Sequence, residues 1–503
     1  MAAQLLAAFF SSPLSYLAVA LGAILLVKWL FRKQVNIPPF PVKPYPILGH
    51  LPFLKKTPRE TVAEWTNKSG EMFSLYMGQT LVVVLNTYDI LKETLVKQSE
   101  HFTDRPPSFI GSISLEGDKG IINNSGHEWK EQRSTTISIL RNFGMGKKSL
   151  ADNIQGEISA YLNELSSYKG KPTEVRTLTN SSVSNVICAI IVGQRFEYSD
   201  PYFINFMNIF SEQMKLLAGT TILNWFHWLR FVPGDLFKAK KIQTNHRALI
   251  NYFSDRYITQ SSHNFDENNV DNFITAYLIE SKKRQNAGEA TTLNDVNLRR
   301  VVANLFIAGS ETTSTTMMWF MIFMIHYPDI QKKVYKEIEE VVGTEREPSI
   351  NDKTHLNYLG ATIMETQRLA SIVPFGLTHM CTTDVTINGY TIPKGARIWP
   401  NLDAVLSDKK TWGDPTVFRP ERFLDAQRNL IVPEHFVPFS LGRRICPGES
   451  LAKMELFLFL SALVQKFELL PTDPTNLPPL KGLFGVTCPP LPFELRFIER
   501  RTL

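Results

Sequence analysis

The longest hydrophobic pattern in the chain covers residues 294–327, NDVNLRRVVANLFIAGSETTSTTMMWFMIFMIHY, and ends before Pro328. Beyond Val301 its residues are apolar on almost every side, which predicts a helix buried all round rather than a surface helix with one apolar face. At 1.5 Å per residue such a helix is roughly 50 Å long. We therefore expect it to cross the whole of one large domain.

Further patterns indicate both helices and strands. DIQKKVYKEIEEVV (329–342) has one apolar face and predicts an exposed helix, and GESLAKMELFLFLSALVQKF (448–467) predicts a strong helix. The early stretch MFSLYMGQTLVVVLNTYDI (72–90) alternates and is rich in β-branched residues, which is typical of strands. In TDVTINGYTIPKGARI (383–398) an Asn-Gly pair supplies the positive φ angles of a hairpin turn. The chain is therefore predicted to be mainly α with small β-sheets.

The first 27 residues, MAAQLLAAFFSSPLSYLAVALGAILLV, carry no charged side chain, and Lys28, Arg32 and Lys33 follow them. An apolar run of about 20 residues spans a bilayer as a helix, and a cluster of cations stays on the cytoplasmic side. A cleaved signal peptide is the alternative, but its basic residues would come before the apolar run. We predict a retained transmembrane anchor over residues 1–27, with the rest of the chain in the cytosol.

A basic, proline-rich segment follows over residues 28–55. Its prolines at positions 38, 39, 41, 44, 46 and 52 fix φ and prevent a regular helix, which predicts a stiff connector. No internal repeat, low-complexity tract or second linker comes after it. Residues 56–503 are therefore predicted to form one large domain.

Composition changes this picture little. The 503 residues carry a net charge of +6 and no block of like charges, so no nucleic-acid partner is expected. The four cysteines, Cys188, Cys381, Cys446 and Cys488, lie far apart and form no C-x-x-C pair. A secreted chain of this size more often has a denser disulfide framework, so we expect the cysteines to be reduced and cytosol-facing.

One cysteine, Cys446, lies in a distinctive setting, PFSLGRRICPGESLAK (438–453). The start of a helix lowers the pKa of a thiol, and Pro447 suits the first helical turn. The glycines on either side, Gly442 and Gly448, allow tight turns and the close approach of a flat ligand. Arg444 offers a cation for an acidic group of that ligand. The alternative is a buried structural cysteine.

With Phe439, these residues form the pattern F-x-x-G-x-R-x-C-x-G, which resembles the haem-binding loop of the cytochrome P-450 family. The resemblance implies a single haem-thiolate fold behind the anchor, with haem b as cofactor. It implies that the Cys446 thiolate is the ligand of the haem iron, where it favours cleavage of the O–O bond. Phe439, Gly442 and Arg444 then belong to the cofactor-binding loop.

Two further motifs extend the resemblance over nearly the whole chain. Glu365 and Arg368 match E-x-x-R, and PERF (Pro420–Phe423) supplies Arg422. A glutamate and an arginine three residues apart share one helix face, and a second arginine can close a buried charge network. A surface ion pair of little consequence is the alternative.

The predicted long helix contains AGSETT (308–313), which is similar to the family motif A-G-x-[DE]-T. A glycine costs about 1 kcal/mol in a helix interior, so something must justify Gly309. A neighbouring hydroxyl can bond back to a backbone carbonyl and open the turn. The resemblance implies that Ala308 borders the haem, and that Thr312 and Glu311 are catalytic residues that relay protons. A kinked helix with an incidental acid is the alternative, but an unpaired buried carboxylate is costly.

Haem also needs partners for its two propionates. In the family these come from a W-x-x-x-R helix, an arginine before it, a histidine on a late strand and the arginine of the cysteine loop. The matching residues here are Trp129, Arg133, Arg105, His379 and Arg444. A tryptophan or histidine in such a position can also be an ordinary core residue.

The leading function is a monooxygenase that inserts one atom of O₂ into an apolar small molecule, such as a fatty acid, a steroid or a foreign compound. No flavin or nicotinamide fingerprint follows the cysteine loop, so the electrons of NADPH are expected from a separate flavoprotein reductase, with cytochrome b5 as a second candidate donor. A haem-thiolate isomerase or dehydratase of lipid hydroperoxides and a non-catalytic haem sensor are the alternatives. The Glu311–Thr312 pair argues against both.

The resemblance also implies a cellular location and several contact surfaces. The anchor, the connector and IVPFGLTH (372–379) are most similar to the animal microsomal branch, which implies a single-pass protein of the endoplasmic reticulum membrane. The apolar stretch 222–234 resembles a loop that touches the bilayer. A cationic docking face for an acidic partner is expected at Lys130, Arg133, Arg443 and Lys453. The residues expected to line the substrate cavity are Phe109, Ile110, Leu305, Val373, Phe375 and Phe484.

Overall fold

The computed structural model describes residues 36–54, 58–114, 117–145, 148–219, 221–259 and 270–500, and the single positions 16, 20, 22 and 23. The predicted anchor, residues 1–27, lies outside these residues apart from those four positions, and it stays a prediction. Among the residues described, no helix is both long and apolar enough to cross a bilayer.

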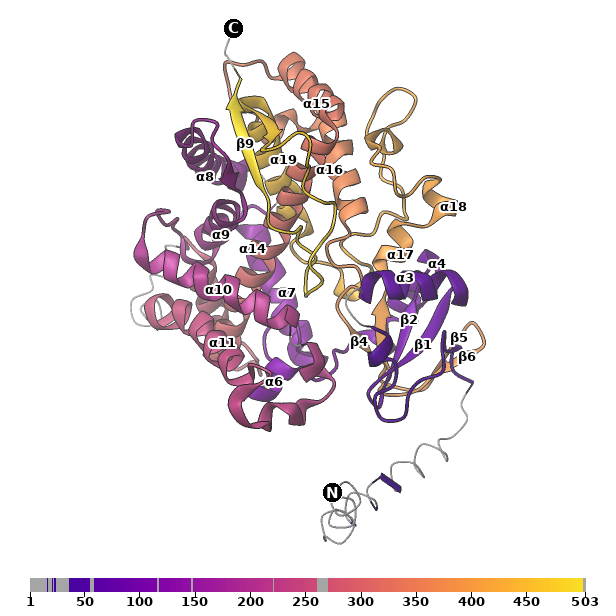
Figure 1. Cartoon of the computed structure of the whole chain (residues 1–503). Helices are drawn as coiled ribbons and strands as arrows, with labels where there is room; N and C mark the ends of the chain where they lie inside the picture. Colours follow the sequence, from indigo (N-terminus) through magenta and orange to yellow (C-terminus); the bar gives the residue numbers. More distant parts are fainter. Residues whose placement is uncertain are drawn as a thin grey trace, which may run out of the picture.

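The described chain is mainly helical with small sheets, as predicted (Figure 1). The helices before the long central one are α3 (Pro58–Ser69), α4 (Tyr88–Lys92), α5 (Ser99–Phe102), α6 (Phe109–Ile113), α7 (Gly126–Asn142), α8 (Lys148–Ser167), α9 (Arg176–Val192), α10 (Pro201–Gly219), α11 (Ala239–Phe253) and α13 (Phe273–Asn286). The later helices are α14 (Asp295–His326), α15 (Pro328–Val341), α16 (Asn357–Ala370), α17 (Leu402–Leu406), α18 (Lys409–Trp412) and α19 (Glu449–Lys466).

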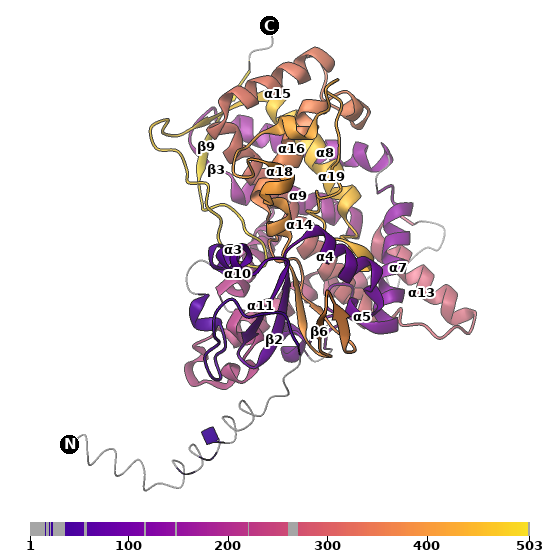
Figure 2. The same cartoon turned by 90° about the vertical axis from the view of Figure 1, so that its right-hand side faces the viewer.

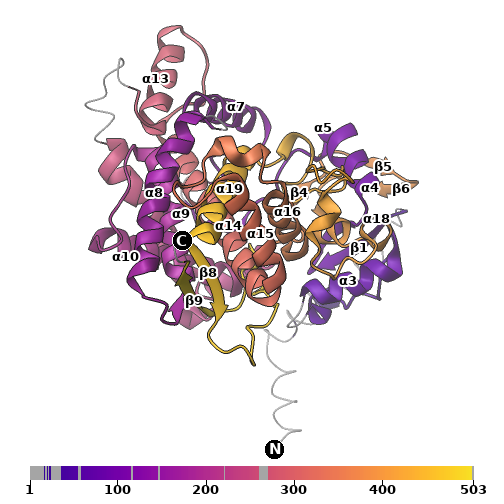
Figure 3. The ribbon, with the colours of Figure 1, turned by 90° about the horizontal axis from the view of Figure 1, so that it is seen from above.

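Helix α14 is the long buried helix expected from the sequence. Its first turn is capped by Asn294, whose side chain accepts a hydrogen bond from the backbone N–H of Asn297 at 2.9 Å. It ends at His326, and Pro328 begins α15. In Figures 1 and 3 it passes through the middle of the molecule, with α8, α9 and α10 on one side and the strand-rich part on the other. Helix α14 thus carries its residues into the centre of the fold.

Gly309 has a packing role in this helix. A Cβ atom at this position would lie 2.5 Å from the Cδ1 atom of Ile187 on α9, which is closer than carbon atoms can approach. The missing side chain therefore lets α9 pack closely against α14. The sequence predicted that Gly309 needs a reason, and the close packing of the two helices supplies one.

The strands form three small sheets (Figure 2). A four-stranded sheet has the order β1 (Met72–Met77), β2 (Thr80–Leu85), β7 (Arg397–Pro400), β4 (His379–Met380), with β2 parallel to β7. The predicted hairpin is β5 (Val385–Ile387) with β6 (Tyr390–Ile392), and Asn388 and Gly389 both have positive φ. The third sheet has the order β3 (Thr173–Glu174), β9 (Glu494–Glu499), β8 (Phe467–Pro471).

Part of the predicted connector lies against the four-stranded sheet. The side chain of His50 is fully buried, and its Nδ1 atom accepts a hydrogen bond from the backbone N–H of Tyr76 at 2.9 Å. The carbonyl oxygen of Pro39 accepts one from the backbone N–H of Ser74 at 2.9 Å. Leu51 and Phe53 pack on the same hydrophobic cluster. Residues 36–54 are therefore attached to the globular body.

The E-x-x-R motif forms a buried charge network, as expected. The Nε and Nη2 atoms of Arg368 lie 2.7 and 2.9 Å from the two carboxylate oxygens of Glu365, and both side chains are fully buried. The Nε atom of Arg422 donates to the same carboxylate at 3.0 Å. Removing one member of such a network leaves an uncompensated buried charge, which costs about 3–5 kcal/mol. The network joins α16 to the Pro420–Phe423 turn.

Candidate haem-thiolate site

The cysteine loop is held by backbone contacts on both sides of Cys446. The backbone N–H of Cys446 donates to the carbonyl oxygen of Phe439 at 3.1 Å. Gly442 has a φ of +75°, and a Cβ atom there would lie 1.9 Å from the carbonyl oxygen of Leu95. A side chain at position 442 would collide with backbone, so glycine lets the loop lie directly on the helical turn Glu93–Lys97.

The thiol of Cys446 is subject to two opposing effects. Burial raises the pKa of Cys446, while a hydrogen bond from the backbone N–H of Gly448 and the charge of Arg133 act in the other direction. The N–H group at the start of α19 thus lowers this pKa, as expected, but burial outweighs it and the net pKa is raised. Pro447 is not in the first helical turn, since α19 begins at Glu449 with Gly448 as its N-cap residue.

Three of the five predicted propionate partners, Trp129, Arg133 and Arg444, lie together at the indole ring of Trp129. The guanidinium carbon of Arg444 lies 3.6 Å from the centre of this ring, and that of Arg133 lies 5.8 Å from it. Arg444 donates from Nε to the carbonyl oxygen of Thr103 at 2.8 Å. Arg133 donates to the carbonyl oxygen of Ile445, next to the cysteine. Helix α7, which carries Trp129 and Arg133, is thereby attached to the cysteine loop.

Arg105 and His379 complete this cluster from the sheet side. Arg105 donates from Nη1 to the carbonyl oxygens of Leu377 and Thr378 at 2.6 and 2.8 Å. The Nδ1 atom of His379 lies 2.7 Å from the carbonyl oxygen of Phe102, and because a carbonyl only accepts, this nitrogen carries the proton. The Nε2 atom of His379 then donates only when the ring is protonated.

The cluster is strongly cationic. Burial and the neighbouring arginines lower the pKa of Arg105 to about 9 and that of Arg444 to about 8, and they hold the pKa of His379 well below its usual value. The Nε atom of Arg105 and the Nε1 atom of Trp129 are buried without a hydrogen-bond partner. Among the described residues, no carboxylate forms an ion pair with Arg105, Arg133 or Arg444, and only Asp104 acts to raise the pKa of Arg444.

A largely buried set of cations with unpaired donors fits an anionic group that the described residues do not supply. The two propionates of haem b are carboxylates, and they would satisfy these donors. Ala308 also fits, because it is exposed in the middle of the largely buried helix α14 and so borders open space. The donor set and the open helix face therefore agree with the haem predicted from the sequence.

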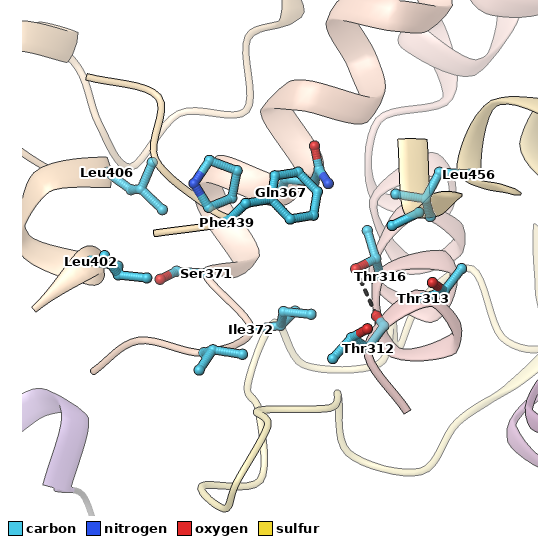
Figure 4. Close-up of a pocket in the computed structure, with 13 residues that line it drawn as sticks. Thr312, Thr313, Thr316, Gln367, Ser371, Ile372, Leu402, Leu406, Phe439 and Leu456 are labelled. Atoms are coloured by element: carbon cyan, nitrogen blue, oxygen red, sulfur yellow. Dashed lines mark hydrogen bonds between the residues drawn. The ribbon is translucent and has the colours of Figure 1, made fainter. Parts of the chain in front are cut away.

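A cavity that is partly open to solvent lies between α14 and the cysteine loop. Figure 4 shows Thr312, Thr313 and Thr316 on one side of it, with Ser371, Leu402 and Leu406 opposite. Phe439 of the cysteine loop also lines this space. The complete set of lining residues is Thr312, Thr313, Thr316, Gln367, Ser371, Ile372, Val373, Leu402, Leu406, Pro438, Phe439, Ala452 and Leu456. The cavity thus brings the threonines of α14 and the cysteine loop to one space.

The two predicted catalytic residues have different surroundings. The Oγ1 atom of Thr312 donates to the carbonyl oxygen of Ala308 at 2.7 Å, so this hydroxyl bonds back to the backbone as expected. Glu311 is buried, does not line the cavity, and accepts a hydrogen bond from Oγ1 of Thr487 at 3.0 Å. Burial raises the pKa of Glu311. Glu311 is only 7% exposed, and its role in proton supply stays a prediction.

The residues expected to line the substrate cavity are spread over several surroundings. Val373 lines the cavity described above, whereas Phe375 and Phe484 contact each other, with ring centres 5.8 Å apart. Phe109 and Ile110 belong to a separate hydrophobic cluster. Leu305 packs on the main core. Of these six residues, Val373 lines the cavity beside Thr312.

Sequence reasoning missed several polar residues of the site. Thr316 lies four residues after Thr312, and helical spacing alone places it on the same face. Its Oγ1 atom donates to the carbonyl oxygen of Thr312 at 2.9 Å (Figure 4). Glu455 of α19 accepts a hydrogen bond from Thr313 at 3.0 Å, and its place within a predicted buried helix was the signal. Thr487 comes from a loop far along the chain, and no local pattern indicates its contact with Glu311.

Comparisons with known proteins agree with this geometry. The sequence model of the family described as Cytochrome P450 matches residues 38–497. Cytochrome P450 2D3 of Rattus norvegicus is 39% identical over 488 residues, which cover 95% of this chain and 96% of the relative. Cytochrome P450 2D6 of Homo sapiens is 38% identical over 488 residues, covering 95% and 97%. Cytochrome P450 2U1 of Homo sapiens is 35% identical over 513 residues, covering 96% and 93%.

Proposed function

The chain belongs to the cytochrome P450 family, and from this premise we propose that it oxidises an apolar small molecule that binds in the cavity beside Thr312. As a member of the family it is a monooxygenase that uses haem b, O₂ and electrons from NADPH. In the overall reaction one oxygen atom enters a C–H bond of the substrate. The other leaves as water, with two electrons and two protons supplied from outside the substrate.

When bound, haem b supplies the redox chemistry that activates O₂. We propose that Cys446 is its iron ligand, and that burial of the sulfur together with the N–H group of Gly448 sets the basicity of the thiolate. The propionates would be bound by Arg105, Arg133 and Arg444, with Trp129 donating from Nε1. A carboxylate beside His379 would raise the pKa of its imidazole, which could then donate from Nε2.

The cavity shared by Thr312 and Phe439 is the observation that supports this function most strongly. The hydroxyl of Thr312 donates its hydrogen bond to the carbonyl of Ala308. The lone pairs of Thr312 Oγ1 are therefore free to accept a hydrogen bond from water in the cavity. We propose that Thr312 positions this water for proton delivery. Glu311, held by Thr487, would act as a buried proton reserve behind it.

Isotope labelling tests this function directly. The full chain is reconstituted with an NADPH-dependent flavoprotein reductase, a panel of apolar ligands is screened for spin-state shifts, and the best ligands are incubated under ¹⁸O₂. We expect a product that carries one ¹⁸O atom and whose formation stops without NADPH. Conversion of a lipid hydroperoxide with no need for NADPH or O₂ would instead indicate the isomerase, and ligand binding without any product would indicate a sensor.

We propose that the electron donor docks on the side of the molecule where the cysteine loop reaches the surface. Lys130, Arg443 and Lys453 are exposed there, and Ile445 is an exposed apolar residue among them. Arg133 is half-buried and donates to the Ile445 carbonyl, so we assign it to the cofactor cluster rather than to the docking face. An exposed cationic rim around an apolar centre suits an acidic flavoprotein reductase, and cytochrome b5 would suit it for the same reason.

We propose a location on the endoplasmic reticulum membrane, with residues 1–27 as a single-pass anchor and the globular body in the cytosol. A second contact with the bilayer is supported by the loop over residues 222–234 and the residues that follow it. Trp228, Phe231 and Leu236 are 63, 73 and 69% exposed, which is unusual for large apolar side chains. Such residues insert readily into the boundary between headgroups and acyl chains.

A further inference from the structure

Arg397 occupies a half-buried position under the loop 222–234. It is the first residue of β7, and it pairs in register with Val82 of β2. Its guanidinium carbon lies 4.6 Å from the centre of the Trp225 ring, and its Nη1 atom lies 3.5 Å from the carbonyl oxygen of Asn224. The second contact is at the limit of hydrogen-bond distance. The loop therefore covers this cation without satisfying its five donors.

Among the residues that the structure describes, Arg397 has no acidic partner. Burial lowers the pKa of Arg397, and no carboxylate of the described residues acts against this or forms an ion pair with it. Arg230 and Arg397 both act to lower the pKa of His227 on the same loop, so the surroundings are positive. The nearby acid is Asp118, whose two carboxylate oxygens accept hydrogen bonds from the backbone and side chain of Ser108. An external anion would be attracted to this position.

A row of half-buried aromatic rings leads from Arg397 towards the cavity. The rings of Trp225 and Trp399 are 6.1 Å apart, and Trp399 stacks on Phe375 at 5.4 Å with an angle of 12° between the planes. Phe375 follows two residues after Val373, which lines the cavity beside Thr312. One end of this row carries a cation and the rest is apolar. Such a surface matches a molecule with an acidic head and a long hydrocarbon chain.

We propose that Arg397 binds the carboxylate of the substrate, and that the substrate is a long-chain aliphatic carboxylic acid. Its chain would lie along Trp399 and Phe375 and enter the cavity at Val373. The oxidised carbon would then be remote from the carboxylate, because the carboxylate is held several aromatic rings away from Thr312. This inference rests on the proposed function and narrows its substrate class. It also explains why a cation that no described carboxylate pairs with lies next to the loop that we assign to the bilayer, from which such acids partition.

A matched pair of ligands tests this role. The holoenzyme is titrated with a saturated long-chain acid and with the alcohol of the same chain length, and the Kd of each is taken from the spin-state shift. A charge-assisted hydrogen bond is about twice as strong as a neutral one, so Arg397→Gln should raise the Kd of the acid about tenfold or more. The Kd of the alcohol should change less than about twofold. For Arg397→Lys, which keeps the charge but not the fork geometry, the Kd of the acid should lie between the values for wild type and Arg397→Gln.

Arg230→Gln is the matched control, because Arg230 is a cation on the same loop that donates to the carbonyl oxygen and hydroxyl of Ser112. It should leave the ratio of the two Kd values unchanged. Equal weakening of acid and alcohol in Arg397→Gln would overturn the proposal and indicate a packing role through Trp225. An equally large rise in the Kd of the acid in Arg230→Gln would also overturn the proposal. Oxidation of a carbon next to the carboxylate would do the same. Absence of haem from wild type would instead contradict the proposed function, and the spectrum of the unliganded protein shows this separately.

Discussion

At the residue scale, two adjacent residues of α14 have separate environments. Thr312 borders the cavity, whereas Glu311 is buried against Thr487. The 100° step between neighbours on a helix turns Glu311 away from the cavity that Thr312 and Thr313 line. We assign the positioning of water to Thr312 and proton storage to Glu311.

Thr312→Ala tests this assignment. The variant should bind haem and substrate nearly as well as wild type, because Thr312 bonds only to the backbone of its own helix. Product formation should fall about 10²-fold or more, which is typical of losing a positioned proton-transfer group, while NADPH consumption continues and hydrogen peroxide is released. Product, NADPH and peroxide are measured together. Ser314→Ala, which removes a buried hydroxyl that bonds back to the carbonyl of Ser310 away from the cavity, is the control. Undiminished coupling in Thr312→Ala would remove Thr312 from the mechanism.

The buried carboxyl of Glu455 should make the free energy of unfolding depend on pH. Burial raises its pKa to about 8, Thr313 donates to one of its oxygens, and the other oxygen has no partner. The unfolded chain releases this proton near its ordinary pKa of 4.5, so the folded state binds more protons between about pH 4.5 and about pH 8. The stability contributed by Glu455 is therefore complete at low pH and is lost as the pH rises through this window.

Glu455→Gln should remove that loss, because glutamine has the same shape and no charge. We expect little change in Tm at about pH 5 and a gain on the order of a few kcal/mol in the free energy of unfolding at about pH 8. Thermal unfolding at both pH values measures this. Glu449→Gln, at the partly exposed start of the same helix, is the control. A difference between Glu455→Gln and wild type that is the same at both pH values would contradict the assignment.

At the element scale, the local patterns of the sequence predicted much of the fold. The buried helix over residues 294–327 is found as α14, and the Asn-Gly hairpin is found as β5 and β6, because hydrophobic periodicity and turn residues act within a few positions. The cation cluster was reached only through the family resemblance. Contacts such as Glu311 with Thr487 and Arg397 with Trp225 join segments more than a hundred residues apart. No local pattern carries that information.

The junction between the cysteine loop and the turn Glu93–Lys97 gives a prediction at this scale. In Gly442→Ala, the new Cβ atom would collide with the carbonyl oxygen of Leu95, and a φ of +75° is unfavourable for alanine. Since backbone cannot move aside as a side chain can, the loop must shift. We expect a loss of several °C in Tm and faster release of haem to an apoprotein acceptor.

Gly156→Ala is the control for this variant. Gly156 lies inside α8, and an added Cβ atom would meet no atom within 4 Å apart from the backbone of its own helix. Alanine there should therefore stabilise the helix by about 1 kcal/mol. Unchanged haem release in Gly442→Ala would show that the close approach of the two segments does not hold the cysteine loop.

At the scale of the whole molecule, the fold places two kinds of element around one central helix. Helix α14 carries the threonines, and α19 packs directly on it (Figure 3). Leu456 of α19 lies on the same side of the cavity as the threonines, with Leu402 and Leu406 opposite (Figure 4). The four-stranded sheet contributes His379 from β4 and Arg397 from β7. The cofactor cluster and the proposed carboxylate site thus depend on the same small sheet.

The proposed function requires Cys446 to be the thiolate ligand of the haem iron, and substitution of this residue tests it most directly. We measure the reduced carbon monoxide spectrum of wild type, Cys446→His, and a control in which buried Cys188 is replaced by alanine. Wild type and Cys188→Ala should show the red-shifted band of thiolate-bound haem. Cys446→His should retain haem, through the cation cluster, but lose that band. A red-shifted band that persists in Cys446→His would contradict the assignment of the site.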